Sequence, residues 1–286
     1  KSLKIMKNNF DFKKKHLIES KSLTKKEIEC FLIESEKYIK FNKKRVKKHN
    51  ILKGRTVFNL FFEDSTRTRT SFEVAAKRLG ADLINVSVKN SSINKGETLL
   101  DTMTTINSMS PDVIIVRHPE EGISKKIANI VDACVINAGD GSHAHPTQAL
   151  LDALTIKKKY NKFNKLKIAI CGDILHSRVA RSNIYLLTML GAEVNIVAPS
   201  NLMPKEIEKF GVNTFTDMKK GLKDCDIVMM LRLQNERMTS SYLSSNREYY
   251  EYYGLTPDKL DHAKSDALIM HPGPMNRGIE IDTRLA

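Results

Sequence analysis

Short apolar runs alternate with amphipathic segments along most of the chain. Apolar residues recur at helical intervals in the amphipathic segments, which predicts helices there. The short runs are rich in Val, Ile, Leu and Phe and predict strands over residues 56–62, 82–88, 112–118, 133–139, 166–172, 192–199, 225–231 and 266–272. Strands that alternate with helices form parallel sheets covered on both faces, so the pattern predicts an α/β fold.

Two of the predicted helices have clear starting points. Thr24 and Glu27 have the spacing of a capping box, and the apolar residues that follow predict a helix over residues 24–47. A longer helix is predicted to start near Pro146, between the first four strands and the last four. We therefore expect two similar domains, 1–145 and 146–286, each a parallel sheet flanked by helices.

Polar clusters follow the predicted strands in both domains. Open parallel sheets bind ligands beyond the carboxyl ends of their strands, so these clusters are candidates for one active site in the interdomain cleft. The clusters are "EDSTRTR" (63–69), "RHPEEG" (117–122), "GDGSHAHPTQ" (139–148), "GDILHSRVAR" (172–181), "RLQNER" (232–237) and "HPGPMNRG" (271–278).

The first cluster predicts an anion site. Ser65 or Thr66 is suited to cap a helix that runs to about Leu79, which leaves the N–H groups of residues 66–68 without helical partners. Such N–H groups bind phosphate, and the Arg67 guanidinium beside them adds a charge-assisted contact. An ordinary capped helix with exposed arginines is the plainer interpretation, but the combination of hydroxyls, arginine and a strand–turn–helix context favours an oxyanion site.

Composition excludes several classes of protein. The chain has 286 residues, of which 41% are hydrophobic, and no run approaches the eighteen or so apolar residues of a membrane span. No secretory signal is visible at the N-terminus, and the four cysteines are far apart without a C-x-x-C pair. We expect a cytoplasmic protein with reduced thiols, no zinc site and no membrane partner.

The net charge of +14 is concentrated in one region. The first fifty residues hold 16 Lys and Arg against 6 Asp and Glu, which contributes +10 of the total. A scaffold that binds nucleic acid or another partner through this segment is one alternative. A solvated, lysine-rich helix face is the favoured interpretation, and no nucleic-acid partner is expected.

A dinucleotide-binding enzyme is a second alternative. "GDGSHA" at 139–144 fits G-x-G-x-x-A between a strand and a helix. That fingerprint also needs an acidic residue about twenty positions later. The corresponding stretch reads "KKKYNKFNK", so we treat the match as accidental and expect no cofactor.

Seven motifs, in order, resemble those of the aspartate carbamoyltransferase catalytic chain, in the aspartate/ornithine carbamoyltransferase superfamily. They are "FFEDSTRTRTSFE", "INKGETLLDT", "VRHPEEG", "GDGSHAHPTQALLD", "GDILHSRVARSN", "MLRLQNERM" and "MHPGPMNRGIEI", and they cover about residues 20–282. The resemblance implies a carbamoyl-phosphate domain followed by an aspartate domain. It also implies transfer of a carbamoyl group from carbamoyl phosphate to L-aspartate, giving N-carbamoyl-L-aspartate and phosphate, in pyrimidine biosynthesis.

The resemblance assigns roles to individual residues. Catalysis is expected to involve Arg67, Thr68, Arg117 and His145. The residues expected to bind carbamoyl phosphate are Ser65, Thr66, Arg67, Thr68, Arg117, His145, Gln148 and, through their backbone, Gly273 and Pro274. The residues expected to bind aspartate are Lys95, Arg178, Arg232 and Gln234. No covalent nucleophile and no metal are implied.

The resemblance also implies an oligomer with shared sites. In the family, the loop that carries Ser92 and Lys95 reaches the active site of the adjacent subunit, so a homotrimer is expected. Regulatory or dihydroorotase-like subunits are possible further partners. Family chains usually continue with another helix beyond the last motif, whereas this sequence ends at Ala286, so that helix is expected either to lie beyond Ala286 or to be absent.

Another carbamoyltransferase, such as one acting on ornithine, is the nearest alternative, because "STRTR" and "HPTQ" are shared with ornithine carbamoyltransferases. Those enzymes have a Cys-Leu-Pro segment where this chain has "HPGPMN" (271–276). "LRLQ" (231–234) adds an arginine suited to a second carboxylate. These two segments favour aspartate as the acceptor.

Overall fold

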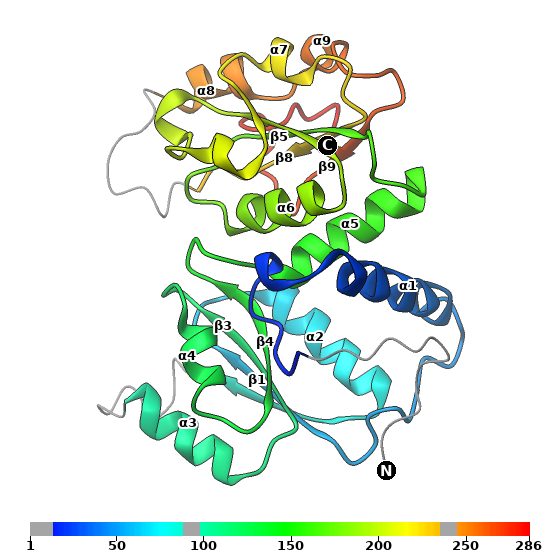
Figure 1. Cartoon of the computed structure of the whole chain (residues 1–286), viewed down its shortest axis with the longest axis vertical. Coiled ribbons are helices and arrows are strands. Elements are labelled where there is room, and N and C mark those ends of the chain that lie inside the picture. Colours follow the sequence, from blue (N-terminus) through cyan, green and yellow to red (C-terminus); the bar gives the residue numbers. More distant parts are fainter. Residues whose placement is uncertain (1–13, 88–97, 235–244) are drawn as a thin grey trace. The chain divides into compact units, whose positions relative to one another are not determined.

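The chain divides into two compact units, Lys1–Leu150 and Leu151–Ala286. The computed structural model describes residues 14–87, 98–234 and 245–286 (Figure 1). Each unit contains one parallel sheet with helices on both of its faces. The predicted α/β class, with two similar parallel-sheet domains, is therefore confirmed.

The first unit has a four-stranded sheet in the order β2-β1-β3-β4. Its strands are β1 (Thr56–Phe61), β2 (Asp82–Ser87), β3 (Val113–His118) and β4 (Cys134–Asp140). Its helices are α1 (Lys25–Phe41), α2 (Thr66–Leu79), α3 (Leu99–Ser108) and α4 (Ile123–Ala128), preceded by a short 3-10 helix, Ser20–Ser22.

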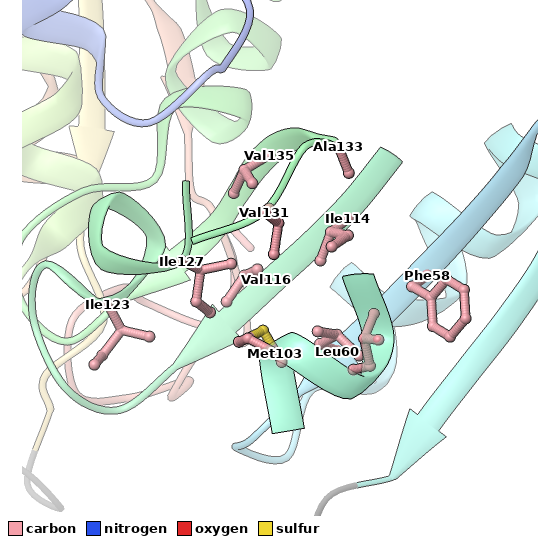
Figure 2. Packing of buried hydrophobic residues seen from close by; sticks show 11 residues of the cluster. Phe58, Leu60, Met103, Ile114, Val116, Ile123, Ile127, Val131, Ala133 and Val135 are labelled. Atoms are coloured by element: carbon pink, nitrogen blue, oxygen red, sulfur yellow. The ribbon is translucent and has the colours of Figure 1, made fainter. Parts of the chain in front are cut away.

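Residues that alternate along the strands of the first unit bury opposite faces of the sheet. Phe58 and Leu60 of β1 pack with Met103 of α3 and Ile127 of α4 in one cluster (Figure 2). The residues on either side of this pair belong to a second cluster: Val57 and Phe61 of β1 pack with Ala76 of α2. Because both faces are buried, the strands are almost continuously apolar, which is why the sequence pattern reveals them.

The second unit has a five-stranded sheet in the order β7-β6-β5-β8-β9. Its strands are β5 (Lys167–Cys171), β6 (Glu193–Val197), β7 (Asn213–Phe215), β8 (Ile227–Met230) and β9 (Leu268–Met270). Its helices include α6 (Arg178–Met189) on one side of the sheet and α7 (Met218–Leu222), α8 (Asn246–Tyr253) and α9 (Pro257–Leu260) on the other (Figure 1). Short 3-10 helices occupy Ser200–Leu202 and Ile207–Phe210, and α5 (Pro146–Tyr160) begins in the first unit and ends in the second.

Two cysteines lie in the core of the second unit. Cys171 at the end of β5 and Cys225 before β8 pack with Val197, Val228 and Met230 in one buried cluster. Burial raises the pKa of the Cys171 thiol well above its usual value and raises that of Cys225 to about 12. Both groups are therefore neutral thiols that contribute apolar packing.

The predicted helix 24–47 starts correctly but ends too late. Thr24 and Glu27 form the predicted capping box, with the Glu27 amide donating to Thr24 Oγ1 at 3.3 Å and the Thr24 amide donating to Glu27 Oε2 at 2.7 Å. The helix ends at Phe41, and Val46 is 71% exposed. The lysine-rich residues after Phe41 have no apolar face to bury, so nothing extends the helix.

The remaining elements were predicted with one omission. All eight predicted strands are present, and α5 starts at Pro146. The short strand β7 was not predicted. No helix in the part of the chain that the structure describes is both long and apolar enough to cross a membrane.

Candidate active site

The direction of the chain across the first sheet reverses between β1 and β3. From β1 the chain moves outward to β2, and from β3 it moves to β4 on the other side. At such a point the two connections leave in opposite directions and open a crevice beyond the carboxyl ends of the strands. "EDSTRTR" follows β1, and Arg117 lies at the end of β3. Two of the predicted anion-binding segments therefore meet at the same edge of the sheet.

The turn after β1 presents the start of α2. Ser65 occupies the N-cap position with φ −159°, and its side chain makes no capping hydrogen bond. Thr66 is the first helical residue, so the amides of residues 66–68 precede the first intrahelical bond, which the Arg69 amide donates to Ser65 O at 3.2 Å. The helix itself was predicted, and its free N–H groups provide the donors that the sequence argument requires.

Arg117 joins the elements around this crevice. Its Nε donates to Glu63 Oε1 at 2.6 Å and its Nη1 donates to Thr68 Oγ1 at 3.0 Å. Nη1 also lies 3.5 Å from the carbonyl oxygen of Ala138 on β4. The guanidinium is thus held by groups from the β1 turn, from α2 and from β4. The structure therefore places the side chains of Thr68 and Arg117, both predicted site residues, in direct contact.

His118, next to Arg117, is an acceptor at the same edge. Its Nδ1 accepts a hydrogen bond from the Glu120 amide at 2.9 Å, and its ring packs against Phe62. Burial lowers the pKa of His118, and the nearby carboxylates oppose this shift only in part. The ring is therefore neutral at physiological pH and adds no charge to the crevice.

His145 and Gln148 lie where β4 leads into α5. His145 immediately precedes the helix and is only 7% exposed, with its Nδ1 3.4 Å from Thr147 Oγ1. The backbone carbonyl oxygen of His145 accepts a hydrogen bond from the backbone amide of Gln148 at 3.1 Å. Both residues therefore belong to the first turn of α5, at the carboxyl end of the strand next to β3.

The second sheet has its own reversal point, between β5 and β8. Arg178 is the first residue of α6, which follows β5, and it is only 5% exposed. Arg232 and Gln234 follow the end of β8. Three of the four residues predicted to bind aspartate thus belong to the two connections that leave this point in opposite directions.

Asp173 organises these two connections. Its carboxylate is fully buried and accepts a hydrogen bond from the backbone amide of Gln234 at 3.3 Å. The same carboxylate lies 2.9 Å from His176 Nδ1. Gln234 Nε2 in turn donates to the carbonyl oxygen of His176 at 3.0 Å. Asp173 and His176 therefore fix Gln234 against the turn that leads to Arg178.

Gly273 and Pro274 follow β9 and are joined by a cis peptide bond. The Gly273 amide donates to His271 Nδ1 at 2.8 Å, and His271 Nε2 lies 3.2 Å from Glu280 Oε1. The backbone of this segment is thus fixed by a buried His–Glu pair. The Pro274 carbonyl and the Gly273 carbonyl are the groups predicted to accept hydrogen bonds from a carbamoyl NH₂.

The sequence argument missed several residues that hold the predicted ones. Glu63, Asp173 and His176 were not assigned roles, yet they contact Arg117 or Gln234 directly. One signal was available: Gly-Asp ends β4 at 139–140 and directly follows β5 at 172–173. Ser92 and Lys95 lie outside the described residues.

Two further features bear on the site. Among residues 14–87, 98–234 and 245–286, no three His, Cys, Asp or Glu side chains are grouped so that they could hold a metal ion. A cavity of about 760 Å³ between α1 and α2 is bordered by Thr66 and Arg67 and is otherwise lined largely by apolar groups such as Phe41 and Val74.

Comparison with known families accounts for both units. Residues 15–158 match the model described as aspartate/ornithine carbamoyltransferase, carbamoyl-P binding domain. Residues 164–286 match the model described as aspartate/ornithine carbamoyltransferase, Asp/Orn binding domain. The chain belongs to the aspartate/ornithine carbamoyltransferase family. It is therefore a carbamoyltransferase by descent, which agrees with the resemblance of the seven motifs.

Individual relatives of the family were also found. The chain is 68% identical over 272 residues to the aspartate carbamoyltransferase catalytic subunit of Pelagibacter ubique, covering 95% of this chain and 87% of that one. It is similar to the structure of Trypanosoma cruzi aspartate transcarbamoylase in complex with carbamoyl aspartate and phosphate, with a TM-score of 0.82 and 30% identity over 94% of this chain and 87% of that chain. The ornithine carbamoyltransferase of Pyrococcus furiosus has a TM-score of 0.84 and 28% identity, over 94% and 88%. Fold alone does not separate the two acceptors, because both structures match well.

Proposed function

We infer that the chain transfers the carbamoyl group of carbamoyl phosphate to the amine of L-aspartate, giving N-carbamoyl-L-aspartate and phosphate. The observation that carries this inference is the 68% identity, along 95% of the chain, to a relative named as an aspartate carbamoyltransferase catalytic subunit. An ornithine acceptor is disfavoured, because the likeness to an ornithine carbamoyltransferase is only 28% and the chain has "HPGPMN" at 271–276.

In this proposal the first unit, with a boundary near residue 145, binds carbamoyl phosphate. The phosphate lies at the start of α2, where Ser65, Thr66, Arg67 and Thr68 supply hydroxyl, amide and guanidinium donors. Arg117 contacts the phosphate and the carbonyl oxygen. This role is supported by its contact with Thr68, which places the guanidinium beside the first turn of α2.

Four residues are proposed to hold the carbamoyl group. His145 donates to the carbonyl oxygen, Gln148 contacts the amide, and the carbonyl groups of Gly273 and Pro274 accept hydrogen bonds from the NH₂ group. Fixed polar groups of this kind orient a small planar substrate at little entropic cost.

The second unit, from about residue 146, binds aspartate. Arg178 and Arg232 pair with its two carboxylates, and Gln234 contributes a hydrogen bond. A planar guanidinium suits carboxylates better than an ammonium group does, because it donates two parallel hydrogen bonds. The buried Asp173, which orders Gln234, supports a site in which the acceptor is bound in one orientation.

The chemistry requires no covalent intermediate on the protein and no cofactor. The amine of aspartate attacks the carbonyl carbon, and negative charge develops on the carbonyl oxygen, where Thr68, Arg117 and His145 donate. The tetrahedral intermediate then collapses with loss of phosphate, which takes up a proton. Catalysis depends on alignment of two small anions and on stabilisation of the developing charge.

We extend the proposal to the assembly and its setting. Ser92 and Lys95 would act in the site of an adjacent subunit, with Lys95 contacting aspartate, so that the active form is a homotrimer. Regulatory or dihydroorotase-like subunits are further candidate partners. The reaction is an early step of pyrimidine biosynthesis, and we propose a cytoplasmic location for it.

An acceptor assay tests the proposed function. The purified chain is expected to carbamoylate L-aspartate with a kcat/KM at least about 1,000-fold above that for L-ornithine, because an acceptor without a second carboxylate cannot make the guanidinium–carboxylate contact proposed for it. Product is measured as N-carbamoyl-L-aspartate or citrulline at equal acceptor concentrations. A preference for ornithine would overturn the proposal. The mass of the particle in solution, measured by light scattering in the same preparation, tests the trimer separately.

A further inference from the structure

The Asp140 carboxylate is a fully buried hub at the end of β4. Oδ1 accepts hydrogen bonds from Asn137 Nδ2 at 2.8 Å and from the Ala144 amide at 3.1 Å. Oδ2 accepts one from the Gly122 amide at 2.8 Å and lies 3.0 Å from His143 Nδ1. A buried carboxylate with four donors is strongly fixed, and removal of its charge would leave these donors poorly satisfied.

Three of the four donors belong to turns next to proposed catalytic residues, and the fourth, Asn137, lies on β4. Gly122 closes the turn that follows Arg117 and His118 at the end of β3 and leads into α4, whereas Ala144 directly precedes His145. Backbone bonds reinforce the link, because the Gly141 amide donates to His118 O at 3.0 Å and the Asp140 amide donates to Ala144 O at 3.1 Å.

The pairing of β3 with β4 shifts at this point, so that His118 lies opposite Asp140 although Val116 lies opposite Asn137. Gly141 has φ +47°, and a Cβ there would lie 2.5 Å from Glu121 Cγ, so the two turns approach too closely for a side chain at this position.

His143 supplies the charge that faces this carboxylate. Its Nδ1 faces Asp140 on β4, and its Nε2 lies 3.3 Å from Glu19 Oε2 on the N-terminal segment. Glu121, from the turn after β3, is the third acid near the ring. The hydrogen bond to Asp140 raises the pKa of His143 although burial opposes it, and the charges of Asp140, Glu19 and Glu121 add to the shift.

Asp140 remains ionised in this setting. Burial alone would raise its pKa, but hydrogen bonds from His143, Asn137 and the Gly122 amide outweigh burial and hold the pKa below the usual range. The pair is therefore an ion pair at pH values below the raised pKa of His143. Above that pKa, His143 keeps a neutral hydrogen bond to Asp140 but loses its attraction to Glu19.

We propose that Asp140, with His143 as its charged donor, is a positioning residue that aligns the Arg117 turn with the His145 turn for carbamoyl transfer. The proposal rests on the proposed function, since it concerns the alignment of groups that act in that reaction. Neither Asp140 nor His143 needs to touch substrate. A misplacement of such groups by about 1 Å costs about 100-fold in rate, because catalysis by alignment depends on the positions of the reacting groups.

The test compares His143→Ala with His143→Asn. The Asn amide places a neutral donor close to the position of Nδ1, whereas Ala removes the donor. We expect kcat of His143→Ala to fall about 10-fold and that of His143→Asn to stay within about threefold of wild type, with smaller changes in either KM. Asp140→Asn is expected to lower kcat by up to about 100-fold. The exposed His262→Ala and Asp261→Asn serve as matched controls and are expected to retain wild-type kcat.

A pH series separates positioning from mere packing. The ratio of wild-type kcat to His143→Asn kcat cancels titrations that both enzymes share. Because the pKa of His143 is raised, its charge is fully present at low pH and is lost as the pH rises through that pKa. The ratio is expected to be about threefold near pH 6 and to fall toward one at high pH. A ratio that does not change with pH, together with wild-type kcat in His143→Ala, would overturn the proposal.

Hydrogen exchange gives a readout that does not depend on turnover. The amides of Gly122 and Ala144 are expected to exchange at least about 10-fold faster in Asp140→Asn and His143→Ala than in wild type, with His143→Asn close to wild type. Unchanged exchange of these two amides in Asp140→Asn would contradict the claim that the Asp140 carboxylate holds the two turns together. If the wild-type chain carbamoylated no acceptor, the proposed function would fail, and Asp140 would lose its positioning role even with the exchange result as expected.

Discussion

Arg117→Ala is expected to lower kcat for carbamoyl transfer by about 100- to 1,000-fold, which is the usual effect of removing one donor that stabilises a developing oxyanion. Arg117 is held from three elements, by Glu63 Oε1 at 2.6 Å, Thr68 Oγ1 at 3.0 Å and the carbonyl oxygen of Ala138 at 3.5 Å. Because the guanidinium is already held in position, it does not have to reorganise as charge develops on the carbonyl oxygen. The loss is therefore expected mainly in kcat, measured by steady-state kinetics with both substrates varied.

Arg117→Lys provides the matched control for charge. Lysine keeps the positive charge but has one donor group in place of the guanidinium fork, so it cannot reach Glu63 and Thr68 together. We expect it to recover at most about a tenth of the lost rate. Near-normal turnover in Arg117→Ala, or full recovery in Arg117→Lys, would contradict the proposed role of the guanidinium geometry.

Arg67→Ala is expected to cost about 3 to 4 kcal/mol of transition-state stabilisation. Arg67 is the second residue of α2 and lies beside the backbone amides that are proposed to contact the phosphate. Its side chain is exposed. Folding should be little affected, because no buried contact is lost. The expected result is a fall in kcat/KM for carbamoyl phosphate with an unchanged Tm, from initial rates and thermal unfolding on the same samples.

Arg69→Ala is the control for this change. Arg69 lies on the same helix, is also exposed and carries the same charge, so its removal alters the general electrostatic field to a similar extent. We expect only about a twofold effect, since exposed charges away from the contact are screened by salt. Equal losses in the two variants would indicate long-range attraction of an anion, and a wild-type rate in Arg67→Ala would refute the phosphate site at α2.

The strands were predictable, because buried parallel strands are continuously apolar. The polar residues proposed to form the site follow the carboxyl ends of these strands, as the sequence pattern indicates. The helix beginning at Thr24 was predictable because its cap is local. β7 was missed because Asn213–Phe215 is a three-residue edge strand whose polar sequence shows no alternation. The end of α1 was missed because apolar spacing does not reveal whether a residue such as Val46 has anything to pack against.

The partners of the predicted site residues were not predictable from local pattern. Arg117 and Glu63 are 54 positions apart, and Gln234 and Asp173 are 61 apart, so each contact depends on the register between strands. A carboxylate beside a site proposed to bind two anions would also be expected to repel them, unless its hydrogen bonds to neighbouring donors are known. The Gly-Asp dipeptides at the carboxyl ends of β4 and β5 were visible, but their meaning depends on the turns that Asp140 and Asp173 hold together.

The burial of Cys171 and Cys225 has a practical consequence for handling the protein. Alkylating reagents attack the thiolate, and neither sulfur forms it at neutral pH while the sheet of the second unit is intact. Cys30 and Cys134, both in the first unit, are partly accessible. Covalent labelling can therefore be confined to one half of the chain, and the appearance of label on the other half reports that its core has opened.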